Sequence, residues 1–250
     1  MKKLILLFLP LLFINCKKET SREDTHGTKI VRVVKHVDGS KIEMEYSYDN
    51  EVRLKEINTL EDEEFYSKSS FFYSNGLLEK LSEEFRSEFL VDSIIWSTRE
   101  KFDRVYRFSG REAQSVRLKT IETYSYNLAG DSIQKISRDP KTDTIQGVGI
   151  FILENGNINQ IDRFNSKGNL TSQFFSEYDN YQNFERDKHY GGVSLFRFNK
   201  NNITRYEIKE YNRNFGSTPN PMNYYYKYNL DGYPIELSND FGEKWEMFYE

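Results

Sequence analysis

Apolar and polar residues alternate along most of the chain with a period of two, which is the pattern of strands that bury one face. Ile42, Met44 and Tyr46 alternate with charged neighbours, and Tyr224 and Tyr226 repeat the arrangement near the C-terminus. Parallel pairing needs long crossover connections, and the chain leaves no room for them. The alternation therefore predicts an all-β domain with antiparallel strands.

Turn signals separate the alternating segments. Asp-Gly and Asn-Gly pairs supply the positive φ angles of tight hairpin turns. Four such pairs predict hairpins, at Asp38-Gly39, Asn75-Gly76, Asn155-Gly156 and Asp231-Gly232. A competing signal lies in residues 79–89, where Leu81, Phe85 and Phe89 have helical spacing. We favour a strand there, with a short helix as the alternative.

One unit recurs along the chain. It consists of an aromatic residue, any residue, Tyr, then Asp or Asn, a short loop, and two aliphatic residues three positions apart. It is clearest from Tyr46 to Ile57, and its second aromatic position recurs at residues 48, 73, 126, 153, 178, 198 and 228. The wide gap between Tyr73 and Tyr126 predicts a weaker copy from Trp96 to Phe108. Each unit accommodates two strands and two turns. Seven or eight units predict a meander of about 14–16 strands, either an open curved sheet or a partly rolled barrel.

The N-terminus has the pattern of an export signal. Lys2 and Lys3 precede an apolar run from Leu4 to Ile14, and Cys16 follows. A helix that spans a bilayer needs about 20 apolar residues, so this run is too short to be a stable anchor. A positive start followed by a short apolar run is typical of a signal peptide.

The position of Cys16 makes the segment resemble a bacterial lipoprotein signal, although Phe13 and Asn15 stand where such signals usually have Leu and a small residue. The resemblance implies removal of residues 1–15 and lipidation of Cys16. Polar residues 17–28 are then a tether, and residues 29–250 form one β domain. A plain secretory signal, with Cys16 incidental, is the alternative, but it lacks a cleavage site of small residues.

Composition and the residues after Cys16 indicate which partners and which cellular location to expect. The chain has 250 residues, a formal net charge of -4 and no basic cluster, which argues against a nucleic-acid partner. A single cysteine excludes an internal disulfide. The Cys-Lys-Lys-Glu start at Cys16 resembles lipoproteins of Bacteroidetes-type bacteria. It implies a cell-envelope protein anchored in the outer membrane through lipid, on either the periplasmic or the surface face.

The repeats carry a further resemblance. The run from Tyr46 to Asp49, followed by Arg53, resembles the YD repeats of RHS-type proteins. The runs 201–204 and 226–234 are similar to uncharacterised Bacteroidetes lipoproteins built from such units. This likeness covers roughly residues 30–249 and implies architecture rather than activity. The closed shell of large RHS proteins is not implied, because the chain has no cargo or self-cleavage segment.

A search for catalytic chemistry finds no constellation in the sequence. The three histidines, His26, His36 and His189, lie far apart and have no metal-ligand spacing. No phosphate-binding loop and no G-x-S-x-G motif is present. The acidic run from Glu61 to Glu64 is typical of a solvated surface. We therefore predict no catalytic residue, no metal, no cofactor and no enzymatic activity.

The aromatic residues remain as candidates for binding. Most repeat tyrosines are expected in the core, whereas Trp96, Trp245 and Tyr225 are possible partner contacts. The leading hypothesis is an envelope lipoprotein whose β domain is a binding or scaffold surface. One alternative is a carrier with an apolar groove for a lipid or another small molecule, and a second is a surface module for glycans or proteins. A hydrolase would require carboxylates that converge in a cleft.

Overall fold

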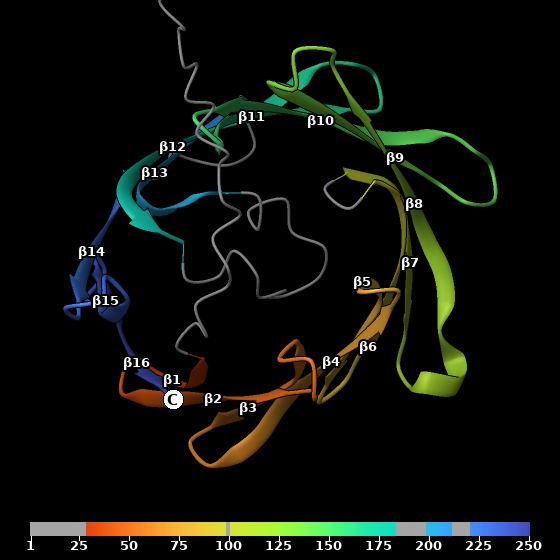
Figure 1. Cartoon of the computed structure of the whole chain (residues 1–250). Helices are drawn as coiled ribbons and strands as arrows, with labels where there is room; N and C mark the ends of the chain where they lie inside the picture. The colour runs from red at the N-terminus through yellow and green to blue at the C-terminus, as the bar shows by residue number, and fades with distance from the viewer. Residues whose placement is uncertain (1–28, 99–100, 184–198, 212–220) are drawn as a thin grey trace, which may run out of the picture.

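The described part of the chain folds into one closed barrel of antiparallel strands, as the computed structural model shows (Figure 1). The structure describes residues 29–98, 101–183, 199–211 and 221–250. Each strand pairs with the next one in sequence, and the last strand pairs with the first, so that no sheet edge remains. The strands are β1 (Ile30–Val37), β2 (Ser40–Tyr48), β3 (Leu54–Glu61), β4 (Glu64–Ser74), β5 (Leu77–Phe85), β6 (Phe89–Thr98), β7 (Lys101–Gly110), β8 (Arg117–Tyr126), β9 (Ser132–Arg138), β10 (Ile145–Glu154), β11 (Asn157–Asn165), β12 (Leu170–Gln182), β13 (Asn201–Glu210), β14 (Met222–Tyr228), β15 (Pro234–Asn239) and β16 (Lys244–Tyr249), with a 3₁₀ turn, η1 (Ala113–Ser115), between β7 and β8.

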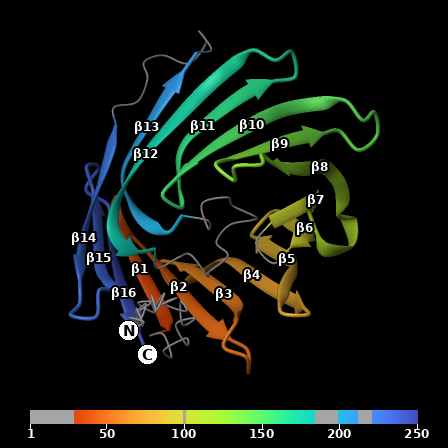
Figure 2. The same ribbon diagram turned by 45° about the horizontal axis from the view of Figure 1, so that its top comes forward.

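This architecture confirms the predicted all-β antiparallel meander and its number of strands. The expectation of an open curved sheet is wrong, because β16 pairs with β1 (Figure 2). The alternative of a partly rolled barrel comes near the observed fold, which is a fully closed barrel. Val33 lies opposite Met247, and the backbones of Lys29 and Glu250 exchange two hydrogen bonds of 3.1 and 2.8 Å beyond the strand ends. A period of two predicts strands but does not tell whether the two ends of a sheet meet.

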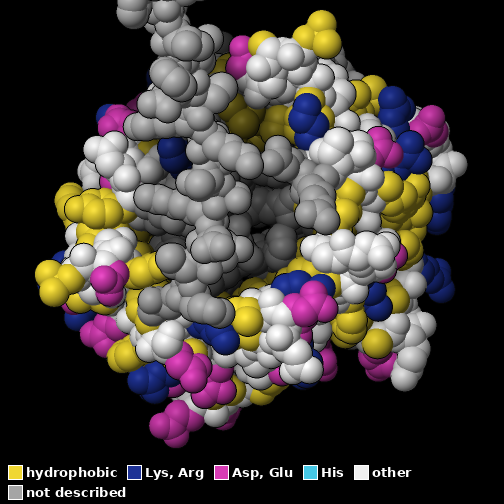
Figure 3. Space-filling model, viewed as in Figure 1, with side chains coloured by type: hydrophobic (Ala, Val, Ile, Leu, Met, Phe, Trp, Pro, Cys, Tyr) yellow, Lys and Arg dark blue, Asp and Glu magenta, His cyan; other side chains and the backbone are white. Residues whose placement is uncertain are grey.

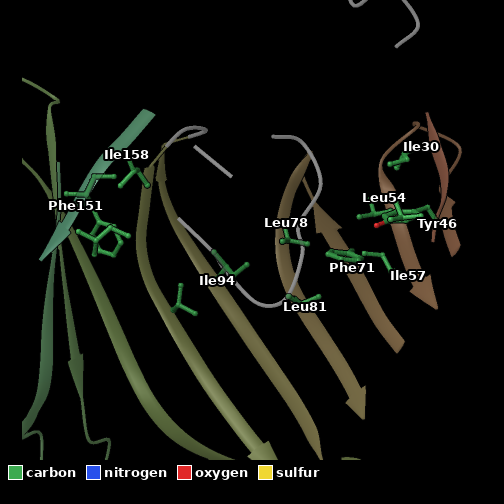
Figure 4. Packing of buried hydrophobic residues seen from close by; sticks show 14 of the residues in the cluster. Ile30, Tyr46, Leu54, Ile57, Phe71, Leu78, Leu81, Ile94, Phe151 and Ile158 are labelled. Atoms are coloured by element: carbon green, nitrogen blue, oxygen red, sulfur yellow. The ribbon is translucent and has the colours of Figure 1, made fainter. Parts of the chain in front are cut away.

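The inner face of the barrel is apolar. Register places the repeat aromatics and the aliphatic residues that follow them on this face, since Tyr46 lies opposite Ile57 and Phe71 opposite Leu81. Figure 4 shows Phe151 on one wall and Tyr46 on the facing wall, both directed into the barrel. Every strand except β13 and β14 contributes a buried apolar residue to one continuous lining, and those two add half-buried tyrosines.

The outer face is largely ionic. Ion pairs join neighbouring strands, among them Arg32–Glu43 at 3.3 Å, Lys68–Glu56 at 2.6 Å and Arg205–Glu177 at 2.8 Å. Outward apolar residues gather on β6–β11 instead, where Val91 pairs with Phe108 and Ile136 pairs with Val148. No helix in the described ranges is both long enough and apolar enough to cross a bilayer.

Six of the repeat units carry a side-chain hydrogen bond that their sequence pattern encodes. Tyr48 Oη donates to the carbonyl of Ile30 at 2.8 Å, so the last aromatic of β2 binds the first residue of β1. The same bond recurs between other neighbouring strands: Tyr73 to Leu54 at 2.9 Å, Trp96 to Leu78 at 2.7 Å, Tyr178 to Ile158 at 2.5 Å, Tyr226 to Ile203 at 3.1 Å and Tyr249 to Pro234 at 2.6 Å. A phenol in an apolar lining needs such a partner. These donors lie where the even-numbered strands finish, and we call this end of the barrel the tyrosine end.

The Asp or Asn after the tyrosine shapes the turn that follows. Asp49 Oδ1 accepts hydrogen bonds from the backbone N–H groups of Glu51 and Arg53, each at 2.9 Å. Asn229 does the same for Asp231 and Tyr233. A carboxylate or amide that binds its own backbone is a turn former. The recurrent Tyr-Asp pair is therefore a strand end followed by a turn.

The predicted hairpin turns are mostly confirmed. Asp38, Asn75 and Asn155 all have positive φ and precede a glycine that also has positive φ. The prediction of a two-residue turn at Asp231-Gly232 is wrong, because only the glycine has positive φ and the pair belongs to the longer turn that Asn229 organises. Residues 79–89 are strand rather than helix.

Two details of the repeat differ from expectation. The copy anchored at Phe198 falls partly outside the described residues, and its Tyr206 lies on β13, the return strand of the unit that contains Tyr178. A unit that the pattern missed contains Met247 and Tyr249, because its two strands, β16 and β1, come from opposite ends of the chain. The weak copy near Trp96 is present on β6 and β7.

The tyrosine bonds give a test of this fold. We expect Tyr48→Phe to destabilise the protein by about 1 kcal/mol, because the ring stays in place while the carbonyl of Ile30 loses its donor. Thermal and urea unfolding measure the change. Tyr225→Phe is the control, since its hydroxyl bonds Asp240 on the exposed face and its loss should change stability by less than about 0.5 kcal/mol. Equal effects of the two substitutions would contradict the structural role of the inward bond.

Candidate functional site

The candidate site is the interior of the barrel. Every substantial contact between described strands joins neighbours in the sheet, so no described strand crosses the interior. A barrel of eight strands is just filled by its own side chains, whereas one of sixteen encloses a wider space. Figure 3 looks along this axis and shows hydrophobic and charged side chains around the mouth of the barrel.

A group of ionisable side chains interrupts the apolar lining on β5–β9. The register brings them to the inner face, because Asp92 lies opposite Arg107 and Tyr124 lies opposite Lys135. Glu83, Asp92 and Glu122 are all buried. We call this group the lumen charge cluster, and it comprises Glu83, Asp92, Arg107, Glu122, Tyr124 and Lys135.

Glu122 is the centre of the cluster and is only 3% exposed. Its Oε2 accepts a hydrogen bond of 2.6 Å from Tyr124 Oη, and its Oε1 accepts one of 3.0 Å from Lys135 Nζ. Arg107 Nη2 lies 3.6 Å from the same carboxylate. The carboxylate therefore has partners on three sides, which is what a buried charge requires.

Arg107 links Glu122 to the rest of the cluster. Its Nε lies 3.4 Å from Asp92 Oδ1, on the neighbouring strand. Beyond Asp92, the carboxylate of Glu83 accepts a long hydrogen bond of 3.5 Å from Ser69 Oγ. Three carboxylates face two cations, so the cluster holds a formal charge of about -1 at neutral pH if all five are ionised.

The environment fixes the protonation of the central pair. Burial raises the pKa of Glu122, but Lys135 and Arg107 outweigh it and hold the pKa below its usual value. Burial and the neighbouring Glu122 carboxylate raise the pKa of Tyr124 far above its usual value. At neutral pH Glu122 is therefore ionised and Tyr124 is a permanent donor to it. The described residues contain no group of His, Cys, Asp and Glu that suits a metal ion.

The residues singled out from sequence are not brought together. Trp96 on β6 and Trp245 on β16 are half-buried against the inner lining, and Lys35 Nζ lies 4.7 Å from the Trp245 ring centroid. Tyr225 lies on the outer face with 56% exposure. Cys16 lies outside the described residues. Partner contact through Trp96, Trp245 or Tyr225 stays a prediction.

Sequence reasoning missed the lumen charge cluster, because charged residues in alternating strands were assigned to the solvated face. The sequence does contain a signal for the inward direction of these charges, because residues two positions apart in a strand share a face. Glu122 stands two residues before Tyr124, and Asp92 stands two residues before Ile94, so both share a face with a residue of the repeat.

The cluster predicts a pH-dependent contribution to stability. We expect Glu122→Gln to destabilise the barrel by about 3 kcal/mol, because Lys135 and Arg107 lose their counter-charge. Because folding lowers the pKa of Glu122, its contribution is present above the unfolded pKa and is lost as pH falls below about 4. Urea unfolding at pH 7 and in steps below pH 5 measures both effects.

The matched control is Glu236→Gln, which removes a carboxylate that pairs with Lys227 and Lys244 on the outer face. Exposed pairs contribute about 0–1 kcal/mol. An equal loss in the two variants, or an unchanged acid dependence in Glu122→Gln, would contradict the central place of Glu122.

Comparison with known proteins shows the fold and corrects the expected family. No family model matches the chain, and no curated protein does. Among solved structures, a porin-like protein from Bacteroides vulgatus matches with a TM-score of 0.54 and 12% identity, over 90% of this chain and 99% of that one. One from Bacteroides uniformis has a TM-score of 0.39 and 9% identity, over 88% and 96%. The resemblance to YD-repeat lipoproteins was therefore wrong as a family assignment, and the fold is a closed barrel similar to that of the Bacteroides vulgatus protein.

Proposed function

We propose that the protein is a lipid-anchored envelope barrel that stands outside the bilayer and binds an apolar or amphipathic ligand in its interior. The observation that carries this proposal is the polarity of the two faces, apolar inside and ionic outside. Binding inside a barrel is a common use of such a scaffold, as in smaller barrels that hold one ligand.

The polarity is the reverse of that in a membrane-spanning barrel. Such barrels present an apolar band about 25 Å tall to lipid and enclose a polar lumen. Here Glu43, Lys68 and Arg205 lie in the middle of β2, β4 and β13 and form ion pairs on the outer face. A Lys or Arg facing lipid at the midplane costs about 2–4 kcal/mol, and these charges recur around more than half of the barrel. The apolar outer residues of β6–β11 cover only one sector, which is not a continuous band.

The proposed anchor is Cys16. Two or more acyl chains hold a protein stably on a membrane. The similarity of the fold to a porin-like protein from Bacteroides vulgatus agrees with a place at the outer membrane. Tethering through residues 17–28 would keep the barrel near that membrane without insertion.

The inner lining suggests the chemistry of the ligand. Tyr46, Phe71, Phe151 and Phe174 place aromatic rings in the apolar part of the wall. The lumen charge cluster offers fixed charges and donors on one side of it. A ligand with an apolar body and a small polar group fits both parts of the wall.

The anchor and the placement outside the bilayer are tested together. We expect metabolic fatty-acid label on the wild type and none on Cys16→Ala. In a second variant a protease site replaces part of residues 17–28, and cleavage followed by dilution should release the barrel from washed membranes. Equal labelling of wild type and Cys16→Ala would remove the anchor. Retention of the cleaved barrel in the membrane after carbonate washing would show a spanning barrel instead.

Interior binding is tested with a fluorescent fatty acid as the probe. We expect Ile208→Gln to weaken its binding roughly tenfold, because it places an amide in the inner lining beside Phe174. Lys209→Gln is the control, since Lys209 is the next residue and pairs with Glu207 on the outer face. Absence of saturable binding to the wild type, or equal affinity of both variants, would rule out the apolar interior as a site.

A further inference from the structure

Exposed apolar side chains gather at one end of the barrel, and it is the end where the chain enters β1. Leu128 and Leu230 are fully exposed at turn tips of the tyrosine end, and Val52 is half-exposed in a third turn. Phe72, Ile95 and Ile152 are exposed just before the ends of β4, β6 and β10. These six residues form what we call the apolar rim.

The opposite end of the barrel has a different surface. Exposed polar or charged residues occupy its turns, such as Asp38, Glu63, Lys141 and Lys167. The exceptions there are Phe241 in one turn, Phe65 and Tyr66 at the start of β4, and Tyr211 after the end of β13. In the turns that begin with Asn, the second residue is leucine at the tyrosine end (Leu128, Leu230) and polar at the opposite end (Ser166, Asp240). The difference follows the ends of the barrel rather than the local geometry of the turns.

Equivalent turns allow a direct comparison. In the turns that begin at Asp49, Asn127 and Asn229, the fourth residue donates its N–H to the first carbonyl. That residue has positive φ and is glycine in the last two turns, but it is Val52, with φ of 64°, in the first. Positive φ is unfavourable for a β-branched residue. Val52 thus places an apolar side chain at this turn, although glycine would adopt the positive φ angle without strain.

The tether indicates what covers the rim. Lys29 pairs with Glu250 at the tyrosine end, so the described chain begins there. Twelve residues span at most about 40 Å, which keeps this end close to whatever holds Cys16. If Cys16 is lipidated, as proposed above, the membrane surface lies nearest to the apolar rim.

We propose that the apolar rim docks on the lipid surface, with the Leu128 and Leu230 tips immersed between head groups and the barrel axis upright on the membrane. Apolar side chains in the interfacial zone gain from leaving water, and a tether raises their local concentration at the surface. The charged outer wall then stays in water, and the end opposite the tyrosine end faces away from the membrane. This inference uses the proposed anchor only to position the membrane.

The experiment places an environment-sensitive fluorophore on a new thiol in the full-length lipoprotein reconstituted in phosphatidylcholine vesicles. Leu128→Cys is compared with Ser166→Cys, because Ser166 occupies the same position in the equivalent turn at the opposite end. We expect a blue-shifted emission and quenching by shallow spin-labelled lipid at position 128. Water-like emission is expected at position 166. Equal, water-like signals at both positions would overturn the docked rim.

A second arm separates the rim from the anchor. Intact mass reports whether Cys16 carries lipid, and the same probes are read on a chain whose residues 1–16 are replaced by a histidine tag bound to nickel-chelating lipid. A blue shift at 128 in this chain supports the rim even if Cys16 is unmodified. A shift that needs no vesicles and grows with protein concentration would show that the rim pairs with a second copy instead, which contradicts the proposal.

The Val52→Gly substitution should affect stability and membrane binding differently. We expect its unfolding temperature to be no lower than that of the wild type, because glycine tolerates positive φ. Binding of the histidine-tagged chain to vesicles without nickel-chelating lipid should weaken by up to about tenfold, because an immersed side chain is lost. Unchanged vesicle binding in a stable Val52→Gly variant would contradict immersion of this tip.

Discussion

The need to remove one face of a sheet from water governs this structure. Each unit of the repeat makes strands whose aromatic and aliphatic residues share a face, and sixteen strands hide that face by closing on themselves. On this apolar face, the hydroxyl of the tyrosine near the strand end would be destabilising without a hydrogen-bond partner. In six of the units, a bond to a carbonyl near the start of the neighbouring strand satisfies the side-chain donor, so the same contact recurs near the strand ends at the tyrosine end.

Closure places the apolar face inside a space that the strands alone do not fill. The lining therefore differs from a conventional core, in which side chains from two layers interdigitate. The lining is a single layer of side chains, and the lumen charge cluster is a polar region within it. Tyr124, Lys135 and Arg107 surround the Glu122 carboxylate, so this buried group remains ionised. The inner wall therefore combines apolar and charged groups on one face.

Much of this fold was predictable from sequence, because a period of two, Asn-Gly turns and tyrosines two apart all report local geometry. The unit formed by Met247, Tyr249 and β1 was not predictable in this way, since its halves lie at opposite ends of the chain. The site was less accessible still. Glu122 and Asp92 look like surface charges in isolation, and only the cross-strand register turns them inward. The likeness to YD repeats rested on a short turn and strand pattern that reports local geometry, and as a family assignment it was wrong.

The unit divided between β16 and β1 has a consequence for how the barrel is made. The pairing of β16 with β1 cannot form until the last strand, Lys244–Tyr249, has been synthesised. An incomplete chain therefore exposes two unpaired strand edges and the apolar inner face of the sheet. Premature termination of synthesis would thus yield an aggregation-prone ribbon rather than a smaller barrel. Conversely, since all strand connections are equivalent in topology, the ring has no privileged starting point, and a circularly permuted gene that joins Glu250 to Lys29 and opens a different hairpin should encode the same closed wall.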